Sequence, residues 1–248
     1  MIIIKNDKEI DLMRIAGRIV AETLLLVEKE VRPGITTAEL DRIAEEFITK
    51  HGAKPSFKGL YGFPASLCIS VNEQVVHGIP GGYVLKEGDI ISVDCGANIN
   101  GFHGDAARTF AVGNISEEAK RLIKVTEESF FKGLEFAKVG NKLTDISHEI
   151  QRYVEVSGFS VVREFVGHGI GKSVHEDPEV PNFGRPGRGP KLVAGMALAI
   201  EPMVNMGSDE IWTDELDEWT VRTEDGLPSA QWEVTVLVTE TGCEVICW

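Results

Sequence analysis

The chain has 248 residues, of which 43% are hydrophobic and 26% are charged, and its formal net charge is −14. These values are typical of a globular protein and exclude a disordered, collagen-like or coiled-coil chain. The acidic balance argues against nucleic acid as a partner, because phosphate binding requires a basic surface that the sequence lacks. The longest apolar run, residues 192–200, is too short to span a bilayer.

The N-terminus begins Met-Ile-Ile-Ile-Lys and has no long apolar core or cleavage site, so we expect no secretory signal. A chain without such a signal is expected in the cytoplasm, where its four cysteines stay reduced. These features predict a cytoplasmic protein with no membrane segment and no nucleic-acid partner.

Apolar residues recur at helical spacing over residues 8–31, and Thr36-x-x-Glu39 has the pattern of a capping box that opens a second helix, closed by Gly52. Two further helices and five strands are predicted from the spacing of their apolar residues. The helices cover 116–137 and 143–157, and the strands cover 89–95, 108–112, 161–166, 197–204 and 232–239. Helices and strands alternate in blocks, which favours a mixed α and β class.

An internal repeat runs through the sequence. Two helical segments of equal length are bounded by glycines, at 34–52 and at 140–158. Further along each half, the tripeptide His-Gly-Ile occurs at 77–79 and again at 168–170. Repeats of this kind indicate duplicated structural units.

A third match follows in the same order. A leucine, a glycine and a carboxylate have the same spacing in both halves, so that Asp94 corresponds to Glu201. Three matches in chain order indicate two related halves, about 1–125 and 126–248, packed face to face around one site. Since the halves share a site, we expect a single domain over residues 1–248.

Four carboxylates stand in or beside apolar strand sequences, namely Asp94, Asp105, Glu201 and Glu233. Each taken alone is as well explained by a strand residue that faces solvent. An unpaired buried carboxylate is costly, however, so four together need a common partner, of which a divalent metal is the simplest. Four carboxylates and one imidazole, such as His168, suit a site for two metal ions.

The histidines differ in their surroundings. His168 lies between two glycines that allow the backbone to approach closely, and His77 belongs to the same tripeptide, His-Gly-Ile. For both histidines this repeat favours a role in the site over a role as an ordinary packed or surface residue. His175 follows His168 by seven residues in a glycine-containing loop and is near enough along the chain to reach the same cleft. For His103, two residues from Asp105, a structural role is favoured.

Taken together, these segments resemble type I methionine aminopeptidases. The resemblance is carried by eight segments that span most of the chain: 62–72, 76–80, 93–96, 101–105, 167–171, 175–178, 200–203 and 229–233. It implies an α+β pita-bread fold, with two pseudo-symmetric αβ halves, a curved antiparallel sheet and a central di-metal site. It also implies removal of the N-terminal methionine from nascent proteins and peptides that have a small second residue.

The resemblance implies a role for each candidate residue. Asp94 would bind one metal ion, His168 and Glu201 the other, and Asp105 and Glu233 would bridge the two. Glu201 would also take a proton from the attacking water. Two further side chains would act on the substrate: His77 at the scissile amide and His175 at the developing oxyanion.

The resemblance further implies that Phe63, Cys68 and Trp219 line a methionine pocket. Some members hold a monovalent cation at the positions of Asn72, Gln74 and Ser229. The divalent metal stays open among Mn, Fe, Co and Zn, because an oxygen-rich site with one imidazole accepts each of them. Two positions depart from the family pattern: Val234 replaces a common histidine, and Val174 replaces an aromatic residue of the pocket.

Two alternatives share the fold. An Xaa-Pro peptidase would carry a large N-terminal domain, for which this sequence has no room, and a binding module would have lost ligand positions that are intact here. Type II methionine aminopeptidases carry an insert between the last two glutamates, whereas Glu201 and Glu233 are only 32 residues apart. The expected partner is the N-terminal methionine of nascent polypeptides, and transient contact with the ribosome stays open.

Overall fold

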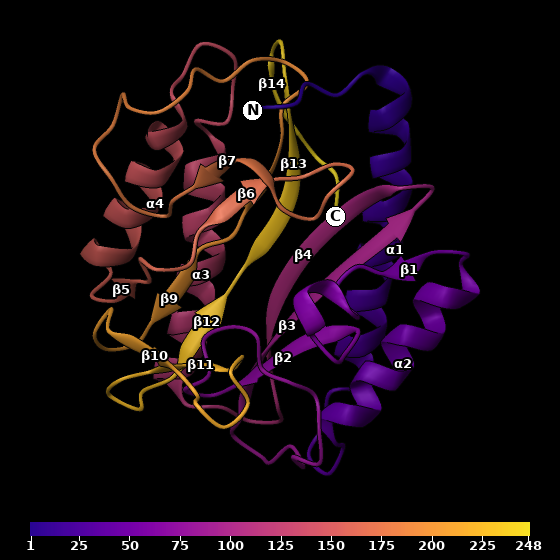
Figure 1. Ribbon diagram of the computed structural model, residues 1–248. Coiled ribbons are helices and arrows are strands. Elements are labelled where there is room, and N and C mark those ends of the chain that lie inside the picture. Colours follow the sequence, from indigo (N-terminus) through magenta and orange to yellow (C-terminus); the bar gives the residue numbers. More distant parts are fainter.

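Four long helices and fourteen short to medium strands follow one another in the computed structural model, which describes residues 1–248 (Figure 1). The helices are α1 (Asp7–Glu30), α2 (Thr37–Lys50), α3 (Glu117–Leu134) and α4 (Leu143–Val156). The strands are β1 (Lys54–Pro55), β2 (Leu67–Val71), β3 (Ile90–Ile99), β4 (Phe102–Ala111), β5 (Ser160–Val161), β6 (Gly167–Gly169), β7 (Glu176–Val180), β8 (Ala197–Ile200), β9 (Met203–Asn205), β10 (Ile211–Thr213), β11 (Val221–Thr223), β12 (Ser229–Gln231), β13 (Glu233–Thr239) and β14 (Gly242–Val245).

All four predicted helices are present, within three residues at either end. Helix α1 begins where the Asn6 side chain accepts hydrogen bonds from the amides of Lys8 and Glu9, while Glu9 accepts one from the Asn6 amide. At α2 only half of the predicted capping box forms: the Thr36 hydroxyl accepts from the Glu39 amide at 3.2 Å. Side-chain caps supply partners for amides that the first turn of a helix leaves free.

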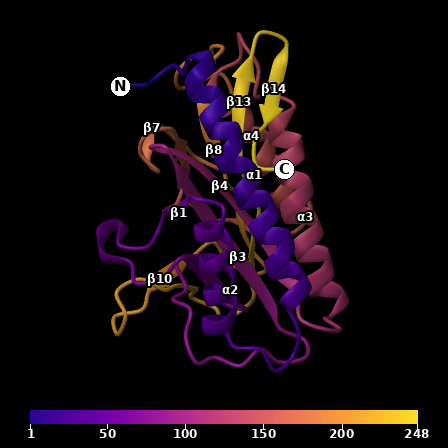
Figure 2. The ribbon, with the colours of Figure 1, turned by 90° about the vertical axis from the view of Figure 1, so that its right-hand side faces the viewer.

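The main sheet is antiparallel and has nine strands. Its order is β1-β3-β4-β13-β8-β6-β7, with β2 on β3 and β14 on β13. Strand β4 of the first half pairs directly with β13 of the second half, so the sheet is continuous across the repeat (Figure 1). Helices α1 and α3 lie on one side of this sheet, and the segments around β7 and β10 project on the other (Figure 2).

The sequence repeat corresponds to repeated structure. Helices α2 and α4 each have 14 residues. Gly88 and Gly195 occupy the same place in each half, two residues before β3 and β8, with φ values of 94° and 87°. Glycine adopts this left-handed conformation readily, whereas other residues are strained in it. This explains why a glycine recurs at the same place in both halves.

Four of the predicted strands have clearly different bounds in the structure, and the one predicted at 89–95 continues to Ile99 in β3. The strand predicted at 161–166 is wrong beyond residue 161, because Arg163 and Glu164 are exposed and the chain bends there toward β6. The strand predicted at 108–112 is the end of the longer β4. The strand predicted at 197–204 is interrupted at Pro202, which has no amide hydrogen for a sheet ladder, and β8 and β9 lie in different sheets.

Strands β4 and β13 pair directly over only two residues each. On either side of this short contact a threonine hydroxyl bridges the strands. Thr109 accepts from the Gln231 amide at 2.9 Å and donates to its carbonyl at 2.8 Å, and Thr235 does the same with Asp105 at 3.0 and 2.9 Å. The hydroxyls hold the strands apart while satisfying their backbone groups, which opens the sheet at the centre of the molecule.

Candidate metal centre

A cavity of about 710 Å³ opens on the face of the sheet opposite the helices, lined by residues of both halves. Every residue predicted for metal binding, catalysis or the methionine pocket lines it, whereas the predicted cation positions Asn72, Gln74 and Ser229 do not. The predicted residues that line it are Phe63, Cys68, His77, Asp94, Asp105, His168, His175, Glu201, Trp219 and Glu233. The structure therefore brings together residues that are up to 170 positions apart in the chain.

Strand register explains why the acidic side chains meet. Asp94 on β3 lies opposite Ala107 on β4, and Ala107 lies opposite Glu233 on β13, so all three belong to one row across the sheet. Asp105 is two residues from Ala107 on the same strand, and alternate residues of a strand point to the same face. The small side chain of Ala107 leaves room between the carboxylates.

His168 enters from the other end of the sheet. On β6 it lies opposite Ala199 of β8, two residues before Glu201. Glu201 follows directly after β8 where the strand is interrupted, and its backbone carbonyl accepts a hydrogen bond from the buried side chain of Asn182 at 2.9 Å. The interruption thus leaves the Glu201 side chain at the cavity with its backbone satisfied.

The candidate ligand atoms lie close to one another. One oxygen each of Asp105 and Glu233 and one ring nitrogen of His168 are all within 4.8 Å of each other. The distance from His168 Nε2 to Glu201 Oε1 is 3.5 Å. Asp94 lies outside the tightest group but lines the same cavity.

Three carboxylate oxygens in this cluster are buried and have no hydrogen-bond partner: Asp94 Oδ1, Asp105 Oδ1 and Glu233 Oε1. A buried carboxylate oxygen without a donor costs free energy that a bound cation offsets. Oxygen-rich groups with one imidazole are suitable for divalent transition metals. The unpartnered oxygens therefore fit a metal site.

The pKa values of the four carboxyls reflect the same strain. Burial raises the pKa of Asp94 to about 7. Burial first, and then the charges of neighbouring carboxylates, raise the pKa values of Asp105, Glu201 and Glu233 above their ordinary range. Packed carboxylates repel each other and take up protons unless a cation neutralises them.

The surroundings of His168 fix which ring nitrogen has a free lone pair. Its Nδ1 lies 2.9 Å from the carbonyl of Gly169, which accepts but cannot donate, so Nδ1 carries the proton. Burial, with a smaller effect of His175, lowers the His168 pKa to about 4, and the ring is neutral. The lone pair of Nε2 is then free to face Glu201 and a metal ion.

The other two predicted histidines flank the cluster. The rings of His168 and His175 are edge to face, with centroids 4.5 Å apart. His77 lies in a loop with φ 59°, between Phe165 at 5.3 Å and Trp219 at 6.2 Å. Burial, followed by the charge of His175, lowers the His77 pKa to about 4.

The two His-Gly-Ile tripeptides share a steric feature. A Cβ on Gly78 would lie 2.2 Å from the carbonyl oxygen of Ile69, and one on Gly169 would lie 2.1 Å from that of Asp177. Each glycine allows a neighbouring strand to pass close to its histidine. The tripeptide is thus repeated for packing, although His77 lies in a loop and His168 in β6.

An apolar wall closes the cavity beside the carboxylates. Phe63, Cys68 and Val174 belong to one buried cluster, against which Trp219 packs. The rings of Phe63 and Trp219 are edge to face at 5.1 Å. Burial first, and nearby carboxylates second, raise the pKa of the Cys68 thiol well above its usual value, so this side chain is a neutral wall residue.

Several residues that line the cavity or support its side chains carry no signal that distinguishes them in the sequence. Phe165 packs on His77, the exposed Tyr61 stacks on His175 at 6.1 Å, and Asn182 holds the backbone of Glu201. In the sequence, Thr235 cannot be distinguished from an ordinary strand threonine. Gln231 was within reach, because it stands two residues before Glu233 in a segment that resembles the family.

Comparison with known proteins decides the family. The model of metallopeptidase family M24 matches residues 11–240. A methionine aminopeptidase from Clostridium perfringens (strain 13 / Type A) is 72% identical over 246 residues, which cover 99% of this chain and 98% of the relative. The chain belongs to metallopeptidase family M24.

Solved structures agree with this family M24 membership. The structure of methionine aminopeptidase from Rickettsia prowazekii matches with a TM-score of 0.99 at 42% identity and covers 100% of both chains. An Xaa-Pro dipeptidase from Bacillus anthracis matches with a TM-score of 0.79 at 26% identity, covering 98% of this chain and 61% of that one. The expected resemblance to methionine aminopeptidases and the expected pita-bread fold are both confirmed.

Family M24 membership and the cluster of potential ligands together support a metallopeptidase that uses divalent metal. None of the four helices has a stretch long and apolar enough to cross a membrane.

Proposed function

We propose that this chain is a methionine aminopeptidase that hydrolyses the first peptide bond of polypeptides beginning with methionine. The observation that carries the proposal is the cavity itself: a group of unpartnered carboxylates lies directly beside a closed apolar wall. Such a wall beside the carboxylates offers a place for the apolar side chain of the residue whose peptide bond is cleaved. The methionine aminopeptidases that match over nearly the whole chain support the same activity.

We assign two divalent ions to Asp94, Asp105, His168, Glu201 and Glu233. Asp105 and Glu233, which lie with His168 in the closest group, would bridge the two ions, Asp94 would hold one ion, and His168 and Glu201 would hold the other. Divalent ions held here supply Lewis acidity toward the attacking water and the scissile carbonyl. The metal is one of Mn, Fe, Co or Zn.

The protein groups carry the proton transfers. Glu201 Oε1 lies 3.5 Å from His168 Nε2 at the edge of the candidate ligand cluster, and its carboxylate would take the proton of the attacking water. His77 and His175 are neutral at pH 7, because burial lowers both pKa values. Each can donate one ring N–H: His175 to the carbonyl oxygen, and His77 near the leaving nitrogen.

Specificity comes from two places. Phe63, Cys68 and Trp219 form the pocket for the methionine side chain. The second residue of the substrate must pass between the ligand cluster and His77, where a branched side chain would be crowded. We therefore assign peptides with a small second residue as the substrates.

We also propose a separate site for a monovalent cation at Asn72, Gln74 and Ser229. Asn72 and Ser229 lie together, since the Ser229 amide donates to the Asn72 carbonyl at 2.9 Å. The side-chain oxygens of Asn72 and Gln74 already accept backbone hydrogen bonds, from Ile90 and Val71. A cation here would therefore be held mainly by backbone carbonyls.

The cellular setting follows from the activity. We propose a cytoplasmic enzyme that acts on nascent polypeptides and meets the ribosome only transiently. We also propose that residues 1–248 form one catalytic domain, because the continuous sheet and the cavity use both halves.

An Xaa-Pro peptidase is the competing function, and one assay separates the two. Met-Ala-Ser and Ala-Pro peptides are incubated with the metal-loaded enzyme, with and without chelator. The proposal predicts cleavage of Met-Ala-Ser that chelator abolishes and little cleavage of Ala-Pro. Preferential cleavage of Ala-Pro would assign the chain to the other activity.

A further inference from the structure

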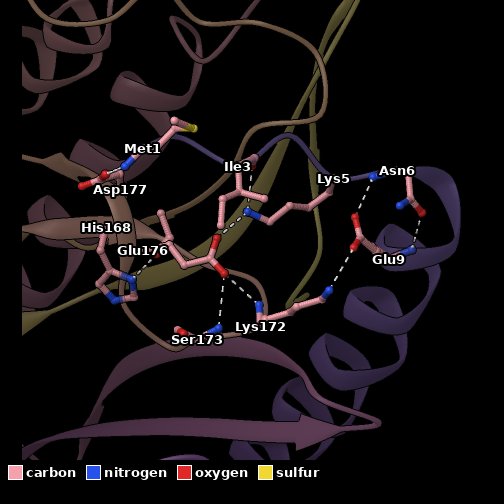
Figure 3. A network of polar contacts seen from close by, with 11 residues as sticks. Met1, Ile3, Lys5, Asn6, Glu9, His168, Lys172, Ser173, Glu176 and Asp177 are labelled. Carbon is pink, nitrogen blue, oxygen red and sulfur yellow. Dashed lines mark hydrogen bonds and ion pairs between the residues drawn. The ribbon is translucent and has the colours of Figure 1, made fainter.

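Residues 1–5, here called the N-terminal arm, run along the rim of the cavity before helix α1 begins (Figure 3). Met1 and Ile3 line the cavity, and the amino group of Met1 pairs with Asp177. The amide of Lys5 donates to the carbonyl of Gly195 at 2.8 Å. The arm is thus attached both to the rim and to the segment that leads into β8.

Lys5 forms an ion pair that is almost completely buried. Its Nζ lies 2.7 Å from Glu176 Oε2, and the two side chains are only 2% and 7% exposed (Figure 3). The same ammonium donates to the carbonyl of Ile3 at 2.9 Å. Apolar side chains at such a position are often at least as stabilising as an ion pair, so stability alone does not account for the charges.

The second oxygen of Glu176 closes a loop. Oε1 accepts from the amides of Lys172 at 2.8 Å and Ser173 at 3.2 Å, which joins the two ends of residues 171–176 (Figure 3). A Cβ on Gly171 would lie 2.5 Å from the Lys5 side chain and 2.8 Å from Glu176 Oε1. The loop is therefore packed directly against the buried ion pair.

His175 is the residue that this loop presents to the cavity. It directly precedes Glu176, and its ring lies 4.5 Å from the ring of His168. On its outer side only the exposed Tyr61 stacks on it, at 6.1 Å. Because Tyr61 is exposed, the buried contacts that can fix the direction of the His175 ring are the His168 ring and the backbone at 175–176.

We propose that Lys5 and Glu176 are positioning residues for His175: the buried pair fixes the loop so that the imidazole faces the reacting carbonyl. The N-terminal arm, far from the ligands in sequence, thereby becomes part of the active site's support. This inference rests on the proposed function, because it assigns a consequence to His175 in that reaction. The pair acts on the position of an oxyanion donor, so its loss lowers kcat more than it raises KM.

The test uses the metal-loaded full-length enzyme and Met-Ala-Ser. Lys5→Met combined with Glu176→Gln removes both charges and leaves an amide oxygen to accept from Lys172 and Ser173. We expect kcat to fall about tenfold or more with metal content unchanged. Lys120→Met, which breaks an exposed pair with Glu117, is the matched control and should leave kcat unchanged.

A double-mutant cycle separates positioning from general destabilisation. In a His175→Ala background, the double variant should lower kcat little further, because the group that it positions is already gone. An equal fold-loss in both backgrounds would overturn the proposal, as would unchanged kcat in the double variant. Glu176→Gln alone provides the same cycle if the double variant does not fold.

NMR of the metal-free protein gives a second readout. The imidazole signals of His175 should shift or broaden in the double variant, whereas those of His51, at the end of α2, should not move. Unmoved His175 signals would contradict the proposal. Failure of the wild-type enzyme to cleave Met-Ala-Ser would instead reject the proposed function itself.

Discussion

The hydroxyl of Thr235 bonds to both backbone groups of Asp105, accepting from its amide at 3.0 Å and donating to its carbonyl at 2.9 Å. Thr235 is fully buried, and the contact stands where β4 and β13 separate. One side chain therefore holds the backbone of Asp105, a carboxylate of the candidate metal site. Groups that orient a ligand in this way influence metal affinity without touching the metal.

Thr235→Val should weaken metal binding by about 10- to 100-fold, because Asp105 loses its backbone support. The variant should also lose roughly 1–3 kcal/mol of unfolding free energy, since a buried amide and carbonyl are left unpaired. Calorimetric metal titration and urea unfolding of the metal-free protein measure the two effects.

Thr109→Val is the matched control, because Thr109 makes the same bridge to Gln231 on the other side of the contact. It should lose similar stability and keep most of its metal affinity. Equal losses of affinity in the two variants would show that the bridges act only through stability.

His77→Ala should lower kcat strongly on Met-Ala-Ser while the metal content stays normal. The physical reason is that His77 lines the cavity outside the candidate ligand cluster and, in the proposed mechanism, would act on the substrate during bond cleavage. Steady-state kinetics together with metal analysis of the same sample make the comparison. Loss of metal in His77→Ala would identify His77 as a ligand instead.

The pH dependence of stability should also depend on His77. Burial lowers its pKa in the folded protein to about 4, below the ordinary value of 6.5. Between these values the unfolded chain binds the extra proton, so His77 contributes stability above pH 6.5 that is lost as the pH falls toward 4. The loss is roughly 1–3 kcal/mol.

His77→Gln removes this titration and should therefore reduce the fall in unfolding free energy between pH 7 and pH 4.5. Urea unfolding of the metal-free proteins at both pH values measures it. Parallel curves for the variant and the wild type would mean that His77 titrates normally in the folded state.

Patterns within a segment predicted much of the fold. The helices follow from apolar spacing and from the Thr36 capping pattern, and the acidic candidates follow from the free-energy cost of placing Asp94 or Glu233 in an apolar strand. The interruption at Pro202 was missed, because the apolar run continues through it and periodicity does not tell which sheet a strand joins.

The contacts that support the candidate ligands from distant segments could not be predicted from the sequence. Thr235 looks like any strand threonine until β4 lies beside it, and Lys5 pairs with Glu176 from 171 positions away. Neither contact has a local pattern. The candidate ligands were recognisable because their chemistry is unusual in a strand, whereas the residues that support them are chemically ordinary.

Substrate choice should depend on the second residue. A β-branched residue there adds bulk to a filled site at a cost of about 1–3 kcal/mol, so kcat/KM should fall roughly tenfold or more from Met-Ala-Ser to Met-Ile-Ser. The protein itself begins Met1-Ile2, so its natively expressed form should keep Met1, as intact mass would show. Equal rates on the two peptides would leave the methionine pocket as the only source of specificity.

The central claim is that five side chains of one cavity hold the divalent metal on which methionine removal depends. The most direct measurement follows metal content and Met-Ala-Ser cleavage together as a divalent transition metal is added to chelator-treated protein, in the wild type and in Asp105→Asn and Glu233→Gln. In the wild type, activity should return as metal is added. Each variant lacks a carboxylate that would bridge the two ions, so each should bind metal poorly at both metal positions and cleave poorly. Near wild-type activity with full metal content in either variant would contradict the central claim.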